Sequence, residues 1–78
     1  MNKKDILEKI IEITAEQLVV DENEIDPKMS FAELNADSLD LVEILSEVED
    51  AFGIEISDSD CSEDMSIEAL AALTASLL

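Results

Sequence analysis

The chain of 78 residues carries 21 aspartates and glutamates against four lysines, and its formal net charge at neutral pH is −17. A field of this sign excludes nucleic acid as a partner and, because no base follows Lys28, points to partner proteins with basic docking patches. The length allows one small domain over residues 1–78, and the absence of histidine, arginine, tyrosine and tryptophan removes most catalytic side chains, so we expect no enzyme.

The first predicted helix runs from about Lys3 to Leu18, with Asn2 as its N-cap and Asp5 at its third position. Apolar side chains recur at helical spacing on one face, while lysines and glutamates occupy the other. We therefore expect this helix to cover a core with the face formed by Leu7, Ile10, Ile11, Thr14 and Leu18.

The segment from Val19 to Ala36 shows no long periodic pattern and contains the only proline, Pro27. A connection of this length in a small domain is usually functional or packed on itself. We expect packing here, with Ser30 capping a short turn that leads to Leu34. The apolar residues that favour this interpretation are Val20, Ile25, Met29, Phe31 and Leu34.

The strongest helical pattern runs from Ser38 to Phe52 and ends at Gly53, the only glycine, which suits the left-handed residue that closes a helix. Asp37 is expected to be the N-cap, because its carboxylate can accept from free backbone N–H groups of the first turn. That leaves Ser38 at the first helical position with a hydroxyl free to point outward. The predicted core stripe consists of Leu41, Ile44, Leu45, Val48 and Phe52.

Leu39 and Val42 fall outside that stripe, close to Ser38. Isolated aliphatic side chains are ordinary on protein surfaces, so these two residues could be exposed without having a function. The alternative is a transient docking surface, because an apolar centre with an acidic rim suits partners steered by charge. The candidate partner-binding residues are Leu39, Asp40, Val42, Glu43, Ser46, Glu49 and Asp50.

After this helix, Ile54 and Ile56 are expected to turn inward from a loop. The segment from Asp58 to Glu63 predicts a single helical turn, in which Cys61 is more simply a packed small residue than a reactive thiol. Ser66 is placed to cap a last helix that begins at Ile67. Its core-facing residues are predicted to be Leu70, Leu73 and Leu77.

Together the elements predict an all-α fold, a small bundle of three main helices plus one short helix, with a long loop between the first two. No apolar run reaches the roughly 18 residues of a membrane span, and the N-terminal residues do not form a signal peptide. A single cysteine agrees with a reducing compartment, so we expect a cytoplasmic protein. The net charge of −17 favours a monomer, because two copies would repel each other. The acidic segments from Asp21 and Asp58 lack the spacing of a calcium loop, so no metal site is expected.

The stretch Phe31-Ala-Glu-Leu-Asn-Ala-Asp-Ser-Leu-Asp-Leu-Val-Glu-Ile-Leu, followed by Glu49-Asp-Ala-Phe-Gly-Ile-Glu-Ile, is similar to the acyl carrier protein family. Asp-Ser-Leu alone is a weak motif, but Phe-x-x-Leu before it and an acidic amphipathic helix ending in Phe-Gly-Ile make the resemblance specific. Asn35 departs from the family, which usually has glycine there. Asparagine tolerates positive φ, so we expect the turn to survive.

The resemblance implies that Ser38 carries 4′-phosphopantetheine through a phosphodiester, with Asp37 and Leu39 as its flanking motif residues, and that acyl groups ride as thioesters on the arm's terminal thiol. A separate phosphopantetheinyl transferase would attach the arm from coenzyme A with Mg²⁺. Enzymes of acyl-chain synthesis or acyl transfer would be the further partners. The resemblance also implies a core that opens to admit an acyl chain, and a core this small has little surplus stability to resist opening.

The resemblance leaves the pathway open. Fatty acid or related acyl-chain biosynthesis is the first expectation, but Ser46 stands where carriers of that pathway commonly have a bulky apolar residue. A specialised polyketide or aminoacyl carrier is the alternative within the family. Outside it, an acidic helical interaction module that is never modified would explain the charge but would leave Ser38 unexplained.

Overall fold

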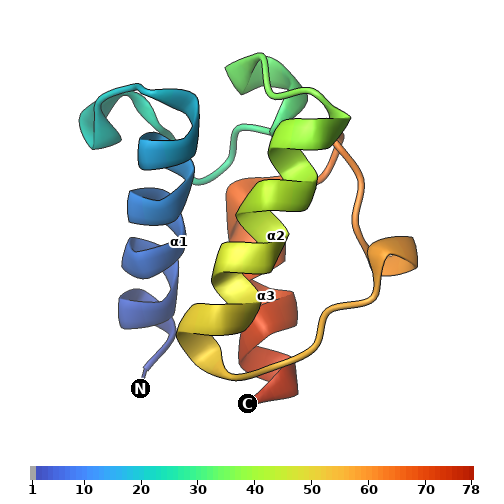
Figure 1. Cartoon of the computed structure of the whole chain (residues 1–78). Helices are drawn as coiled ribbons and strands as arrows, with labels where there is room; N and C mark the ends of the chain where they lie inside the picture. Colours follow the sequence, from blue (N-terminus) through green and yellow to red (C-terminus); the bar gives the residue numbers. More distant parts are fainter. Residues whose placement is uncertain (1) are drawn as a thin grey trace.

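The computed structural model describes residues 2–78, which form three α-helices joined by loops with short 3₁₀ turns (Figure 1). Helix α1 spans Lys3–Leu18, α2 spans Ser38–Phe52 and α3 spans Ile67–Leu77. Helix α1 packs against both α2 and α3. In Figure 1, α1 runs upward and the other two run downward, so both chain ends lie at the end of the bundle opposite to the start of α2. The predicted all-α fold is confirmed.

Polar side chains at the N-caps fix the starts of α1 and α3. Asn2 accepts a hydrogen bond from the backbone N–H of Asp5 at 2.9 Å, and the Ser66 hydroxyl accepts one from the N–H of Ala69 at 3.0 Å. Each bond satisfies an N–H group that has no partner within its own helix. Both caps therefore lie where the sequence predicts them.

The ends of α1 and α2 share one type of turn, built around a left-handed residue. The N–H groups of Val19 and Val20 both donate to the carbonyl of Ala15, and Gly53 and the residue after it donate in the same way to the carbonyl of Glu49. The φ angle is 57° at Val19 and 66° at Gly53. Glycine adopts this conformation freely, whereas a β-branched residue does so only under strain.

The core is aliphatic around a fully buried Phe31, with two polar side chains inside it. These are Thr14 on α1 and Thr74 on α3, each 0% exposed. The Thr74 hydroxyl donates to the carbonyl of Leu70 at 2.8 Å. Within residues 2–78, the Thr14 hydroxyl has no hydrogen-bond partner. The buried apolar residues are Ile6, Ile10, Ile13, Ala15, Ile25, Phe31, Ala36, Leu41, Ile44, Leu45, Val48, Ile56, Ile67, Leu70 and Ala71.

The predicted core face of α1 is confirmed but incomplete. Ile10 and Thr14 are buried, and the remaining three members are partly buried and pack against the core: Leu7, Ile11 and Leu18. Ile6 and Ile13, which the prediction left out, are buried as well. Because α1 contacts two helices, it buries a wider arc than a single amphipathic stripe, and the centre of that arc is displaced from the predicted one.

One prediction for the C-terminal third is too long and another is wrong. The single helical turn predicted over Asp58–Glu63 is present as a 3₁₀ turn, but it covers only Asp58–Asp60, and Cys61 follows it in extended backbone. This turn has no side-chain cap and no apolar stripe that would hold a longer helix against the core. Leu77 is 44% exposed and does not face the core, because the last turn of α3 lies at the open end of the bundle (Figure 1).

The connection between α1 and α2 is packed on itself, as predicted, with Ile25 and Phe31 buried. It contains 3₁₀ turns at Glu22–Glu24 and Ala32–Leu34. Ser30 caps the second turn, because its hydroxyl accepts a hydrogen bond from the N–H of Glu33 at 3.1 Å. None of the helices within residues 2–78 is long and apolar enough to cross a membrane.

The second half of this connection is bonded to the segment that leads into α3. Four backbone hydrogen bonds of 2.8–3.2 Å join residues 27–32 to residues 63–68, and we call this set the loop tie. It fixes the turn before α2 against the start of α3. The donors and acceptors are Phe31 to Met65, Ala32 to Glu63, Ile67 to Met29, and Glu68 to Pro27.

Candidate attachment site and docking face

A reciprocal cap holds the start of α2. The Asp37 carboxylate accepts a hydrogen bond from the backbone N–H of Asp40 at 2.8 Å, and the Asp40 carboxylate accepts one from the N–H of Asp37 at 3.2 Å. The predicted capping role of Asp37 is confirmed. Just before it, Asn35 adopts a left-handed φ of 64° and donates its N–H to the carbonyl of Ala32 at 2.9 Å, so the turn survives the replacement of glycine.

Ser38 occupies the first helical position and is exposed. Because Asp37 provides the cap, the Ser38 hydroxyl takes no part in it. A phosphate ester on Ser38 would lie beside the positive end of the helix dipole, but the Asp37 and Asp40 carboxylates oppose a negative charge there. This arrangement suits an anionic group held by a covalent bond better than an anion that binds freely, so the site fits a phosphodiester.

Two apolar side chains lie beside Ser38 on the outer surface of α2. Leu39 is 64% exposed and Val42 is 54% exposed, whereas the predicted core stripe of the same helix turns inward. The two are three residues apart and therefore neighbours on one helical face. Both lie outside the core stripe, as predicted. The stripe contributes four buried residues, Leu41, Ile44, Leu45 and Val48, and the partly buried Phe52.

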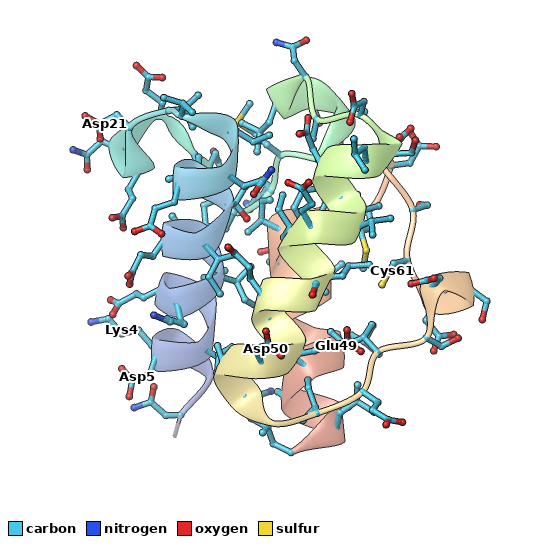
Figure 2. The ribbon with its side chains drawn as sticks, in the orientation of Figure 1. Lys4, Asp5, Asp21, Glu49, Asp50 and Cys61 are labelled. Carbon is cyan, nitrogen blue, oxygen red and sulfur yellow. The ribbon has the colours of Figure 1, made fainter. Side chains whose placement is uncertain are left out.

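Several acidic residues predicted to form the rim already have partners within the chain. The exposed Glu43 carboxylate accepts a hydrogen bond from the side-chain amide of Gln17, which links α2 to the end of α1. The half-buried Glu49 accepts one from the backbone N–H of Ile56 at 2.8 Å and so holds the loop that follows α2. Figure 2 shows Glu49 on the loop side of α2 and Asp50 on the side facing α1.

A shallow groove of about 340 Å³ lies between α1 and α2. It is remote from the attachment site, since Asp50 lies about 18 Å along the helix axis from Ser38. Its only base, Lys9, pairs with Glu12 at 3.5 Å. Within residues 2–78, no group of three potential metal ligands comes together. The groove is lined by Lys9, Ile13, Glu16, Glu47, Asp50 and Ala51.

Cys61 is half-buried and packs against the core, and Figure 2 shows it between α2 and the loop that follows. Burial raises the pKa of its thiol above the ordinary value of 9.0, and the carboxylates of Asp60 and Asp58 raise the pKa further. The thiol therefore keeps its proton at neutral pH and is a poor nucleophile. This environment favours the predicted packing role over a reactive one.

Comparison with known proteins agrees with the local geometry. Residues 8–74 match the family described as a phosphopantetheine attachment site. An acyl carrier protein of Rubrobacter xylanophilus is 52% identical over 69 residues, which are 87% of this chain and 85% of that protein. An acyl carrier protein of Thermosynechococcus vestitus is 50% identical over 64 residues, or 81% and 79% of the two chains. The chain belongs to the acyl carrier protein family.

As a member of this family, the molecule is a carrier and not an enzyme, and its cofactor is 4′-phosphopantetheine. Its family implies a transferase that attaches the arm and enzymes that handle acyl groups as partners. The family resemblance predicted from the sequence is confirmed.

Sequence reasoning missed the Asp40 half of the cap, although an acid at the third position of a capped helix is a recognisable signal. It also missed the two side-chain bonds of Glu43 and Glu49, because their partners depend on the path of the chain.

Proposed function

We propose that Ser38 carries the phosphopantetheine arm of this acyl carrier protein. The observation that carries the proposal is the exposed Ser38 hydroxyl at the start of α2, released from capping by Asp37 and followed by Leu39 in the Asp-Ser-Leu motif. In attachment, the Ser38 oxygen loses its proton and bonds to the pantetheine-bearing phosphorus of the coenzyme A pyrophosphate. The bond from that phosphorus to the bridging oxygen breaks, and adenosine 3′,5′-bisphosphate leaves. The arm supplies a terminal thiol that holds acyl intermediates as thioesters.

The docking face proposed for partner enzymes is the outer surface of α2. Leu39 and Val42 provide its apolar centre, and the surrounding carboxylates pair with basic patches. Asp50 is exposed and has no side-chain hydrogen bond among residues 2–78. It can therefore pair with a basic residue of a partner without breaking a hydrogen bond within this part of the chain. Other carboxylates of the set must share or exchange an existing bond. The full proposed set is Leu39, Asp40, Val42, Glu43, Ser46, Glu49 and Asp50.

For the pathway, we propose fatty acid or related acyl-chain biosynthesis, with the protein acting as a monomer in the cytoplasm. The net charge of −17 supports the monomer, because two copies repel each other. Ser46, exposed on the docking face, favours the alternative of a polyketide or aminoacyl carrier, since it replaces the bulky apolar residue common in fatty-acid carriers. Mass spectrometry of the thioester isolated from the native host distinguishes these cargoes.

The attachment proposal is tested by intact mass after incubation with coenzyme A, Mg²⁺ and a broad-specificity phosphopantetheinyl transferase. We expect a gain of one phosphopantetheine on the natural sequence and on Ser62→Ala, which removes an exposed serine outside α2. Ser38→Ala should keep its fold and gain nothing. A folded natural sequence that gains no mass would instead favour the unmodified interaction module, and a gain on Ser38→Ala would place the arm elsewhere.

The docking proposal is tested by charge reversal. The variant Glu43→Lys with Asp50→Lys is compared with Glu8→Lys and Glu24→Lys, which make the same change in net charge at exposed positions outside α2. We expect kcat/KM of the transferase for the first variant to fall well below that for the second at low ionic strength, with the gap narrowing as salt is added. Equal losses for the two variants would mean that only total charge matters.

A further inference from the structure

Val19 combines backbone strain with nearly complete exposure. It closes α1 with a φ of 57°, in the left-handed region that a β-branched residue adopts only under strain. The carbonyl of Ala15 holds it there by accepting from the N–H groups of Val19 and Val20. Val19 is 89% exposed, so packing in the core does not offset the strain. A strained residue without a packing role is a candidate for a functional one.

The exposed apolar residues lie at the two ends of the bundle. Within residues 2–78, Leu77 and Leu78 are exposed at the end opposite to the start of α2 (Figure 1). The other exposed large apolar residues lie toward the end that holds Ser38, and they are Val19, Leu39 and Val42. Val19 therefore shares its end of the bundle with the apolar centre proposed for docking.

Val19 also lies on the side of α1 that meets the docking face. Leu39 and Glu43 are four residues apart and are therefore neighbours on one face of α2. The Glu43 carboxylate accepts a hydrogen bond from the side chain of Gln17, two residues before Val19. Because α1 and α2 run in opposite directions, the chain from Gln17 to Val19 runs toward the level of Ser38 (Figure 1). The surface around Leu39 thus continues across this bond to the end of α1.

We propose that Val19 is an apolar contact for the phosphopantetheinyl transferase and extends the docking face from α2 to the end of α1. The inference rests on the proposed docking face and on attachment at Ser38. The transferase must bring its catalytic site to the Ser38 oxygen, so it covers the end of the bundle where Val19 is exposed. Exposed carboxylates flank Val19 in the chain at Glu16 and Glu22, so the fitting surface is an apolar patch bordered by bases.

The test measures kcat/KM of the transferase for matched variants. Val19→Thr keeps the β-branched shape and the strained backbone but replaces a methyl group by a hydroxyl, so it should lower kcat/KM by about 5- to 30-fold. Val19→Ile keeps an apolar β-branched side chain and should retain the natural value. Leu78→Ser removes an exposed apolar side chain at the opposite end of the bundle and should also retain it.

Two further measurements separate an apolar contact from charge and from folding. Added salt does not screen an apolar contact, so the loss in Val19→Thr should persist at high salt, unlike the loss from charge reversal on α2. Val19→Gly relieves the strain and should raise the Tm, yet it should lower kcat/KM as Val19→Thr does. A variant that is more stable and a poorer substrate does not owe its loss to unfolding.

Leu39→Ser separates failure of the inference from failure of the docking face. If Leu39→Ser lowers kcat/KM and Val19→Thr does not, the docking face ends at α2 and the inference is overturned. An equal loss in Leu78→Ser would also overturn it, because the effect would not depend on position. If neither Leu39→Ser nor Val19→Thr lowers kcat/KM, the docking face itself is refuted, and the inference fails with it.

Discussion

Replacing Val19 by glycine is expected to stabilise the protein, although the change removes a side chain. Val19 holds a left-handed φ of 57°, a conformation that disfavours L-residues by about 1–2 kcal/mol. Its side chain is 89% exposed, so little apolar burial is lost. Glycine offsets part of the gain by about 0.5–1 kcal/mol, because it loses more backbone freedom on folding. With both ranges taken at their midpoints, the expected net increase in the free energy of unfolding is about 0.75 kcal/mol.

Thermal unfolding followed by circular dichroism checks this expectation, and the Tm of Val19→Gly should rise by about 2–8 °C. Gly53→Ala provides the mirror experiment at the end of α2. No tertiary contact lies within 4 Å of a Cβ added at Gly53, so the loss of stability there reports backbone strain without a steric clash. A lower Tm for Val19→Gly, or an unchanged Tm for Gly53→Ala, would refute the argument that φ decides stability at these turns.

Three further predictions concern local contacts. Asp37→Ala should lower the free energy of unfolding by about 0.5–2 kcal/mol in urea titrations, whereas Asp37→Asn, which can still cap, should retain most of it. Glu49→Ala should speed amide exchange at Ile56 and remove about 1–2 kcal/mol of stability, because it leaves the N–H of the buried Ile56 without its acceptor. The pH dependence of the alkylation rate of Cys61 should give a thiol pKa above 9.0. Asp60→Asn should lower this pKa, because it removes a neighbouring negative charge. Because the folded state keeps this proton longer than the unfolded chain, stability contributed by Cys61 should be constant below pH 9.0 and fall as pH rises through the higher folded pKa.

The backbone geometry around Ser38 was predictable because its signals are local. Asp37 caps α2 through the N–H of a residue three positions on, and Gly53 ends the helix with the only glycine in the chain. Asn35 tolerates the left-handed conformation in the turn before the cap. All of these interactions depend on a few consecutive residues, so residue type and spacing are sufficient to predict them.

The features that sequence reasoning missed depend on distant contacts. Ile6 and Ile13 are buried because α1 packs against two helices. The periodicity of α1 alone does not predict how many helices pack against it. Leu77 has the helical spacing of the core residues of α3, but the last turn of this helix extends beyond the part that packs against the core. Glu49 looks like one more surface acid until the loop after α2 brings the N–H of Ile56 to it.

The loop tie has a consequence for the order of events during synthesis. It bonds residues 27–32 to residues 63–68, so the turn before Ser38 lacks its support until the chain has left the ribosome as far as Glu68. Closing a loop of this size carries an entropic cost that only the docked helices can offset. We expect a chain truncated after Asp60 to be a poor substrate for the transferase, so that arm attachment acts as a checkpoint for completed folding.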